Sequence, residues 1–192
     1  MAATSEERVL IKRARAGDED AFEQIVAMHA ERVYGALRRF GLDPGEADDV
    51  AQEVFLRAWR SLDRFEGRAQ LSTWLYRIAF NEAQRRLARN AAATLGTDPG
   101  GEDRLRTVQG PAGERPEARL EGRELTAMLD RALRELPDEW RAAVVLRDLE
   151  GLSTVEAARA VGVREPAFKS RLHRGRMQLR ALLEPYLDAD DV

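Results

Sequence analysis

Apolar residues in the first ninety positions recur three or four residues apart, which is the spacing of one face of an α-helix. Gly17, Gly41 and Pro44 interrupt this pattern, and Asp18 is placed to cap the helix that follows it. The pattern predicts helices over residues 6–16, 19–40, 45–62 and 72–89. A short polar loop at 65–68 separates the last two.

The pattern is lost between residues 90 and 119, where no apolar period can be followed. Glycine and proline are frequent in this stretch: Gly96, Pro99, Gly100, Gly101, Gly110, Pro111, Gly113 and Pro116. Such a composition buries too little apolar surface to offset the entropy lost on ordering, so it predicts a flexible linker over residues 91–119. The linker would separate a first unit at 1–90 from a second at 120–187, with an acidic tail at 188–192.

The second unit also has helical spacing. It predicts one helix over residues 125–136, ended by Pro137, and another over 138–149. Evidence for strands is weak, because the apolar run Val144-Val145-Leu146 has helical flanks. We therefore predict an all-α fold of two small helical domains joined by the linker.

A helix-turn-helix motif is predicted in the C-terminal domain. Ser153 and Glu156 have the spacing of a capping box, in which each side chain satisfies a backbone N–H of the first helical turn. Gly162 can take the positive φ of a tight turn, and Pro166 fits the first turn of the next helix. The residues predicted to face inward are Val155, Ala158 and Val161 on the first helix, and Phe168, Leu172 and Leu179 on the second.

The second helix of this motif carries a polar stripe beside its apolar face. Lys169 and Ser170 are followed one turn later by His173 and Arg174. A cationic, hydrogen-bonding stripe on the second helix is what reading the DNA major groove requires. Helix-turn-helix folds also serve protein contacts, so a protein-interaction module remains an alternative.

The net charge of the chain is −3, which by itself argues against binding to nucleic acid. The distribution of the charges weakens this argument, because basic and acidic residues are segregated along the chain. Residues 164–180 contain six basic residues against one acidic residue, a net charge of +5, while acidic residues gather at 46–53 and at the C-terminus. A solvated basic helix beside an acidic tail is the alternative explanation.

Composition excludes several classes of protein. There is no cysteine and there are only two histidines, which leaves no thiolate zinc site, no cysteine nucleophile and no histidine-rich metal site. No apolar run approaches the ~20 residues that span a bilayer, and the N-terminus lacks a signal-peptide pattern. We expect a cytoplasmic protein without membrane insertion, cofactor or small-molecule substrate. With no P-loop and no catalytic triad, we do not expect an enzyme.

Two stretches of the first unit are candidates for binding. In residues 67–89, Trp74, Tyr76 and Phe80 lie among arginines, a mixture that suits single-stranded DNA, although Trp74 and Ile78 are better explained as core. Residues 48–62 form an amphipathic helix whose first acidic residues serve either its dipole or a partner.

Two segments together resemble the extracytoplasmic-function (ECF) sigma factors of bacterial RNA polymerase. The segment at 48–87 is similar to that family's second conserved region and reads DDVAQEVFLRAWRSLDRFEGRAQLSTWLYRIAFNEAQRRL. The segment at 136–180 is similar to its fourth region and reads LPDEWRAAVVLRDLEGLSTVEAARAVGVREPAFKSRLHRGRMQLR. The resemblance implies that the chain binds core polymerase, recognises two promoter elements and promotes DNA opening.

The resemblance also implies roles for individual residues. The minus-thirty-five element would be read by Arg164, Lys169, Ser170, Arg171, His173 and Arg174. The minus-ten element would be bound by Gly67, Arg68, Gln70, Leu71, Ser72, Asn81, Arg85 and Arg86. Core polymerase, through its β′ clamp helices, would be contacted by Asp48, Asp49, Gln52, Glu53 and Arg57. The family further implies a contact with the polymerase β flap and an anti-sigma factor that masks these faces.

Three positions depart from the family pattern. Arg164 stands where a capping serine is common, Phe168 replaces a smaller valine, and Leu71 stands where an aromatic residue is common. An ordinary helix-turn-helix regulator, which does not replace the specificity subunit of polymerase, remains the main alternative function.

Overall fold

The computed structural model describes residues 5–67, 69–94 and 116–187, and all its regular elements are helical. In the first part these are α1 (Ser5–Arg15), α2 (Glu19–Arg39), α3 (Pro44–Ser61), a 3₁₀ turn (Leu62–Arg64) and α4 (Leu71–Thr94). In the second part they are α5 (Pro116–Arg134), α6 (Asp138–Val144), a π-helical turn (Val145–Leu149), α7 (Thr154–Ala160) and α8 (Glu165–Leu187). The all-α prediction is confirmed for these residues.

The ends of the predicted linker are helical. Helix α4 continues to Thr94 and helix α5 begins at Pro116, so each helix reaches further into the glycine-rich stretch than its apolar pattern indicated. Residues 95–115 of the predicted linker, the acidic tail at 188–192 and Arg68 lie outside the described residues.

Helix starts follow local chemistry that the sequence displays. Asp18 accepts a hydrogen bond from the Ala21 backbone N–H, which confirms it as the cap of α2. Asp43 and Glu46 form a capping box at the start of α3, a cap that the sequence analysis did not identify. Ser153 caps α7 in the predicted box.

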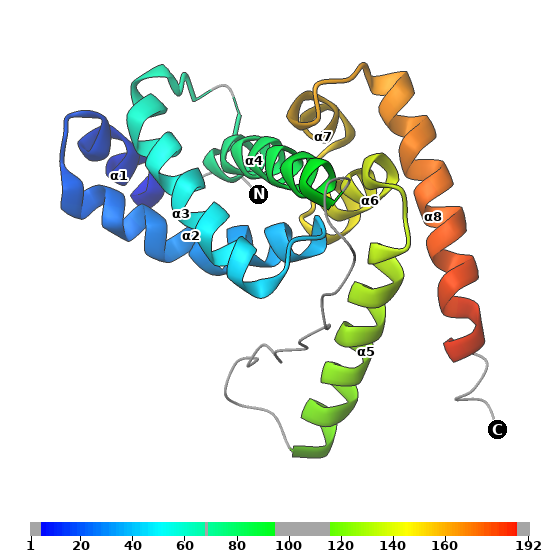
Figure 1. Ribbon diagram of the computed structural model, residues 1–192. Coiled ribbons are helices and arrows are strands. Elements are labelled where there is room, and N and C mark those ends of the chain that lie inside the picture. Colours follow the sequence, from blue (N-terminus) through cyan, green and yellow to red (C-terminus); the bar gives the residue numbers. More distant parts are fainter. Residues whose placement is uncertain (1–4, 68, 95–115, 188–192) are drawn as a thin grey trace.

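The first four helices enclose the larger share of the core. Helix α2 packs against α1, α3 and α4, and α3 also packs along α4. Their inward faces bury Ile25, Leu37, Val54 and Leu75 almost completely. Figure 1 shows α3 passing in front of α2, with α4 beside both.

The second part is organised by the crossing of α6 and α8. Gly175 lies at this crossing, where an added Cβ would stand 3.0 Å from the Trp140 carbonyl oxygen, so the two backbones approach closely. Phe168 of α8 is fully buried, as predicted, but Val155 is 43% exposed and its predicted inward position is wrong. Helix α7 has only seven residues, and its buried face is formed by Ala157, Ala158 and Ala160 instead.

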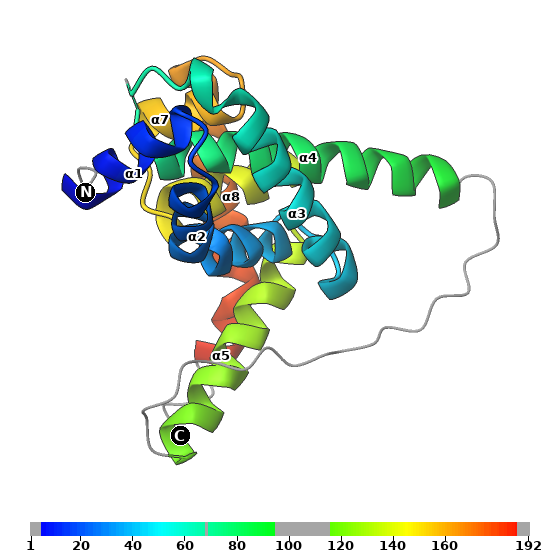
Figure 2. The ribbon, with the colours of Figure 1, turned by 90° about the vertical axis from the view of Figure 1, so that its left-hand side faces the viewer.

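The two parts touch one another. Helix α7 packs against α4, and buried apolar residues of both parts form one continuous core. Figure 1 shows α6 and α7 beside α4, while α5 and the end of α8 project away from this junction, as Figure 2 also shows.

Candidate nucleic-acid and polymerase interface

The polar stripe of α8 faces solvent as predicted. Lys169, Ser170, His173 and Arg174 are all exposed, whereas Phe168 and Leu172 on the opposite face are buried. Arg164, just before the helix, is exposed as well. The buried apolar face therefore holds α8 in place, and the opposite face presents hydrogen-bond donors to solvent.

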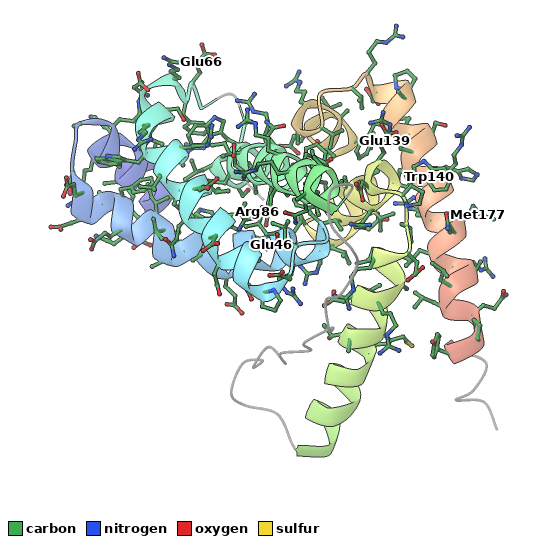
Figure 3. The ribbon with its side chains drawn as sticks, in the orientation of Figure 1. Glu46, Glu66, Arg86, Glu139, Trp140 and Met177 are labelled. Carbon is green, nitrogen blue, oxygen red and sulfur yellow. The ribbon has the colours of Figure 1, made fainter. Side chains whose placement is uncertain are left out.

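Ion pairs hold some of these cations along the surface of the second part. Lys169 lies 2.7 Å from Glu165 one turn earlier, and Arg171 is half-buried against Glu139 of α6 at 3.0 Å. The Arg174 guanidinium lies 6.0 Å from the centre of the Trp140 ring. Figure 3 shows Glu139 and Trp140 beside α8, the helix that carries the labelled Met177.

The turn of the motif has the predicted geometry. Gly162 has φ +70°, a conformation that glycine adopts without the strain that a side chain brings. Pro166 is the second residue of α8, where its missing N–H has no helical partner to lose. The turn thus fixes the angle at which α8 leaves α7.

The loop before α4 and the exposed face of α4 contain the residues assigned to the minus-ten element. Gly67, Asn81 and Arg85 are exposed, and Gln70 and Ser72 are half-buried. Leu71 is 1% exposed, so its side chain supports the loop from beneath and is not available to a base. Its assignment as a contact residue is therefore corrected.

The aromatic residues of α4 are part of the core rather than a stacking surface. Tyr76 is 2% exposed, and its hydroxyl donates a hydrogen bond to Glu150 of the second part. Burial and the Glu150 carboxylate raise the pKa of Tyr76 above its usual range, so the hydroxyl keeps its proton. Trp74 packs against Phe65 at 5.4 Å between ring centres, which confirms its interpretation as core.

The residues assigned to polymerase line the outer face of α3. Asp48, Asp49, Gln52 and Arg57 are exposed, and Glu53 is half-buried. They occupy successive turns of one helix, which makes a single contact face.

One of these residues is bonded to a residue assigned to DNA, and a second shares a carboxylate with another such residue. Asp49 lies 3.0 Å from Arg86, and Arg57 shares the buried carboxylate of Glu82 with Arg85. Figure 3 shows Arg86 beside Glu46, its second carboxylate partner at 3.3 Å. The residues assigned to polymerase and those assigned to DNA are therefore neighbours along the α3–α4 contact.

A groove of about 980 Å³ runs between α2 and α3 on the same side as Asp48 and Gln52. Phe22, Val26 and Trp59 are among its apolar lining residues. The acidic residues of its lining are Glu19, Glu23, Glu31 and Asp48. The groove therefore combines an apolar surface with acidic side chains along its lining.

Residues that join the two parts were missed from the sequence. Arg141 is buried and donates to four backbone carbonyls, one of which belongs to Phe40 in the first part. Burial lowers the pKa of Arg141 and raises the pKa of Asp130 in α5. The signal in the sequence was weak for Arg141 and Asp130, because a single charged residue in a helix resembles ordinary surface charge.

Within the described residues, no helix is long and apolar enough to cross a membrane. The same residues contain no group of three or more His, Asp or Glu side chains placed to hold a metal ion.

The fold and the exposed α8 stripe define a class: a two-part helical protein whose helix-turn-helix exposes a cationic, hydrogen-bonding stripe of the kind that suits DNA. Two family models match the chain: "Sigma-70 region 2" over residues 25–93 and "Sigma-70, region 4" over residues 126–179. The chain belongs to the sigma-70 family and is an ECF-type RNA polymerase sigma factor, in which regions 2 and 4 serve promoter recognition and no enzymatic activity is involved.

Similar proteins match most of the length of the chain. The RNA polymerase sigma-H factor of Pseudomonas aeruginosa is 32% identical over 97% of this chain and 98% of its own. The ECF RNA polymerase sigma factor SigW of Bacillus subtilis is 33% identical over 90% and 94%. Among solved structures, CnrH in complex with the cytosolic domain of CnrY covers 94% of this chain and 99% of its own, with a TM-score of 0.65 and 31% identity.

Proposed function

We propose that the exposed stripe of α8 reads the minus-thirty-five element in the major groove. Lys169, Ser170, His173 and Arg174 provide the contacts, with Arg164 on the adjacent backbone. Arginine and lysine donate to guanine edges or phosphates, and serine and histidine can do either. Arg171 reaches phosphate after exchanging its Glu139 partner. The exposure of four polar residues above a buried apolar base is the observation that carries this proposal.

The minus-ten element is assigned to the loop before α4 and to the exposed face of α4. Gly67, Gln70 and Ser72, with Asn81, hold one unstacked base, while Arg85 and Arg86 follow the backbone. Arg68 belongs to the same loop by its place in the sequence. Unpairing a base costs a few kcal/mol, and stacking returns ~1–3 kcal/mol per base, so this chain alone cannot open a promoter.

Core polymerase supplies the remaining binding energy. The β′ clamp helices dock on the α3 face of Asp48, Asp49, Gln52, Glu53 and Arg57. The α2–α3 groove continues this face, and its acidic rim favours a helix with basic and apolar side chains. The β flap binds the second part.

An anti-sigma factor is the remaining partner that we propose. CnrH is 31% identical and covers 94% of this chain. Its structure is described in complex with the cytosolic domain of CnrY. For this chain, a partner that covers the α3 face or the α8 stripe would block polymerase or DNA. Co-purification from a strain that expresses the tagged chain, repeated with an Asp49→Lys variant, tests whether the α3 face is used.

Run-off transcription tests the assigned function. The chain with purified core polymerase should initiate at defined start sites on genomic fragments. Lys169→Ala and Arg174→Ala should each weaken promoter binding by the holoenzyme, and a residue that contacts phosphate should also reduce the salt dependence by about one unit of log–log slope. Arg180→Ala, an exposed arginine further along α8, is the matched control.

Two results would support the alternatives. A chain that binds DNA but never initiates with core polymerase would be an ordinary helix-turn-helix regulator. If Lys169→Ala and Arg174→Ala left all activity intact, the motif would serve protein contacts. Tight, specific promoter binding by the chain without polymerase would contradict the division of binding energy proposed above.

A further inference from the structure

A buried carboxylate lies at the contact between α3 and α4. The side chain of Glu82, on α4, is 4% exposed, and its Oε1 atom is paired with two arginines. The Nε atom of Arg57, on α3, lies at 3.1 Å, and Arg85, three residues further along α4, donates a hydrogen bond through Nη1 at 2.6 Å. A buried carboxylate without a cationic partner is strongly disfavoured, so Glu82 needs at least one of these arginines.

This cluster has one positive charge in excess, because two guanidinium groups share a single carboxylate. Both arginines also reach solvent, since the side chain of Arg57 is 51% exposed and that of Arg85 is 59% exposed. A guanidinium has five N–H groups in a fixed, planar arrangement. Each arginine can therefore donate to an anionic ligand at the surface while another of its N–H groups stays on Glu82.

The cluster connects side chains that we assign to different partners. Arg57 belongs to the α3 face assigned to polymerase, and Arg85 belongs to the residues assigned to the minus-ten backbone. Asn81, assigned to the unstacked base, is exposed and directly precedes Glu82 in the chain. Glu82 itself is too buried to contact either partner, so any effect that it has on binding passes through the two arginines.

We propose that Glu82 is a positioning residue for promoter recognition, which fixes Arg85 against the minus-ten backbone while Arg57 compensates the charge of Glu82 from α3. The inference rests on the proposed DNA contact of Arg85. A long side chain that is already held loses less conformational entropy on binding. Without Arg57, Glu82 would have Arg85 as its only cation in the cluster, and less of that charge would be offered to phosphate. Arg57 therefore acts on DNA binding without touching DNA.

A double-mutant cycle tests this role. The probe is a genomic fragment on which the wild-type holoenzyme initiates, and its dissociation constant is measured at several salt concentrations with holoenzyme purified after assembly. Arg85→Ala should weaken binding and lower the log–log salt slope by about one, as for any lost phosphate contact. Arg57→Gln should weaken binding about threefold, but should have no effect when residue 85 is already alanine. Arg60→Gln, which changes another exposed arginine of α3, is the matched control and should change nothing.

Glu82→Gln separates positioning from general attraction between charges. It removes a negative charge, so binding to a fragment without a promoter should stay equal or become tighter. A neutral amide holds a guanidinium more weakly than a carboxylate does, so the ratio of promoter to non-promoter affinity should fall about tenfold. A residue that only joined α3 to α4 would lower stability and leave this ratio unchanged. Arg86 pairs with Glu46 and Asp49 across the same two helices, so we expect the variant to keep its helical circular dichroism.

The positioning role is overturned if the effects of Arg57→Gln and Arg85→Ala simply add, or if folded Glu82→Gln keeps the wild-type affinity ratio. If Glu82→Gln does not fold, the cycle between the two exposed arginines decides the question. An Arg85→Ala holoenzyme with the affinity and salt slope of the wild type refutes the minus-ten assignment, and the role of Glu82 with it. The expected loss in Arg85→Ala combined with additive effects refutes the positioning role alone.

Discussion

Arg141 offers the strongest single test of how the fold is held together. Its guanidinium donates to the carbonyl oxygens of Leu133 at 2.9 Å, Arg134 at 3.1 Å and Leu136 at 2.9 Å, and to that of Phe40 at 2.8 Å. The last carbonyls of a helix have no partner within the helix. One side chain therefore caps the ends of both α5 and α2.

The magnitude follows from these bonds. Three of the four are buried, and each buried carbonyl left without a partner costs about 1–3 kcal/mol. Arg134 is exposed, so water can replace the hydrogen bond to its carbonyl oxygen, and losing that bond adds little to the free-energy cost. We expect Arg141→Met, which keeps most of the side-chain volume, to lower the free energy of unfolding by about 3–5 kcal/mol, a large share of the ~5–15 kcal/mol of a typical domain.

Urea unfolding followed by circular dichroism measures this loss. Arg131→Met, an exposed arginine on α5, is the matched control and should change stability by less than about 0.5 kcal/mol. Gly41→Ala should act like Arg141→Met, because Gly41 has φ +107° and an added Cβ would lie 2.2 Å from the guanidinium of Arg141. If Arg141→Met costs less than about 1 kcal/mol, the carbonyls find water and our account of the junction is wrong.

Two further predictions concern packing and pH. Gly175→Ala should destabilise the second part by about 1–3 kcal/mol in thermal unfolding, because the new Cβ would meet the Trp140 backbone; Gly35→Ala meets only the flexible side chain of Arg39 and serves as control. Backbone hydrogen bonding at the start of α2 lowers the pKa of Asp18, and the Ser153 hydroxyl lowers that of Glu156. Since both pKa values fall on folding, these groups stabilise fully above pH ~4.5, and their contribution is lost as the pH falls through the folded values. Unfolding measured from pH 6 to pH 3 should show this loss, and Asp18→Asn, which keeps a cap, should reduce it; an unchanged acid profile would contradict the assignment.

Local chemistry explains what the sequence could predict. Asp18, Ser153 and Gly162 each act within four residues of their own position, so spacing alone identified the cap of α2, the box of α7 and the turn before α8. The outward stripe of α8 was predicted for the same reason, since a helix with a buried apolar face must present its other side to solvent.

Contacts between distant residues explain what was missed. Tyr76 lies among arginines, and only its partner Glu150, 74 residues away, shows that it is a junction residue. Val155 was placed inward by helical spacing, but α7 is so short that its alanines fill the contact with α4 and α8. Leu71 was assigned to a base pocket by resemblance, whereas the packing beneath the loop places it in the core.

The ion pairs between α3 and α4 connect residues that we assign to different partners, so the role of each residue depends on its neighbour. Asp49 was assigned to polymerase and Arg86 to DNA, yet the two are bonded to each other at 3.0 Å. Asp49 is largely exposed, and an exposed pair is worth only ~0–1 kcal/mol, so either partner can be released at small cost when a macromolecule replaces it. Glu82 and Glu150 are different, because each carboxylate is only 4% exposed, so neither can lose its partners without water entering. The exposed Asp49–Arg86 pair therefore leaves both binding faces accessible, whereas the bonds to Glu82 and Glu150 hold their helices together.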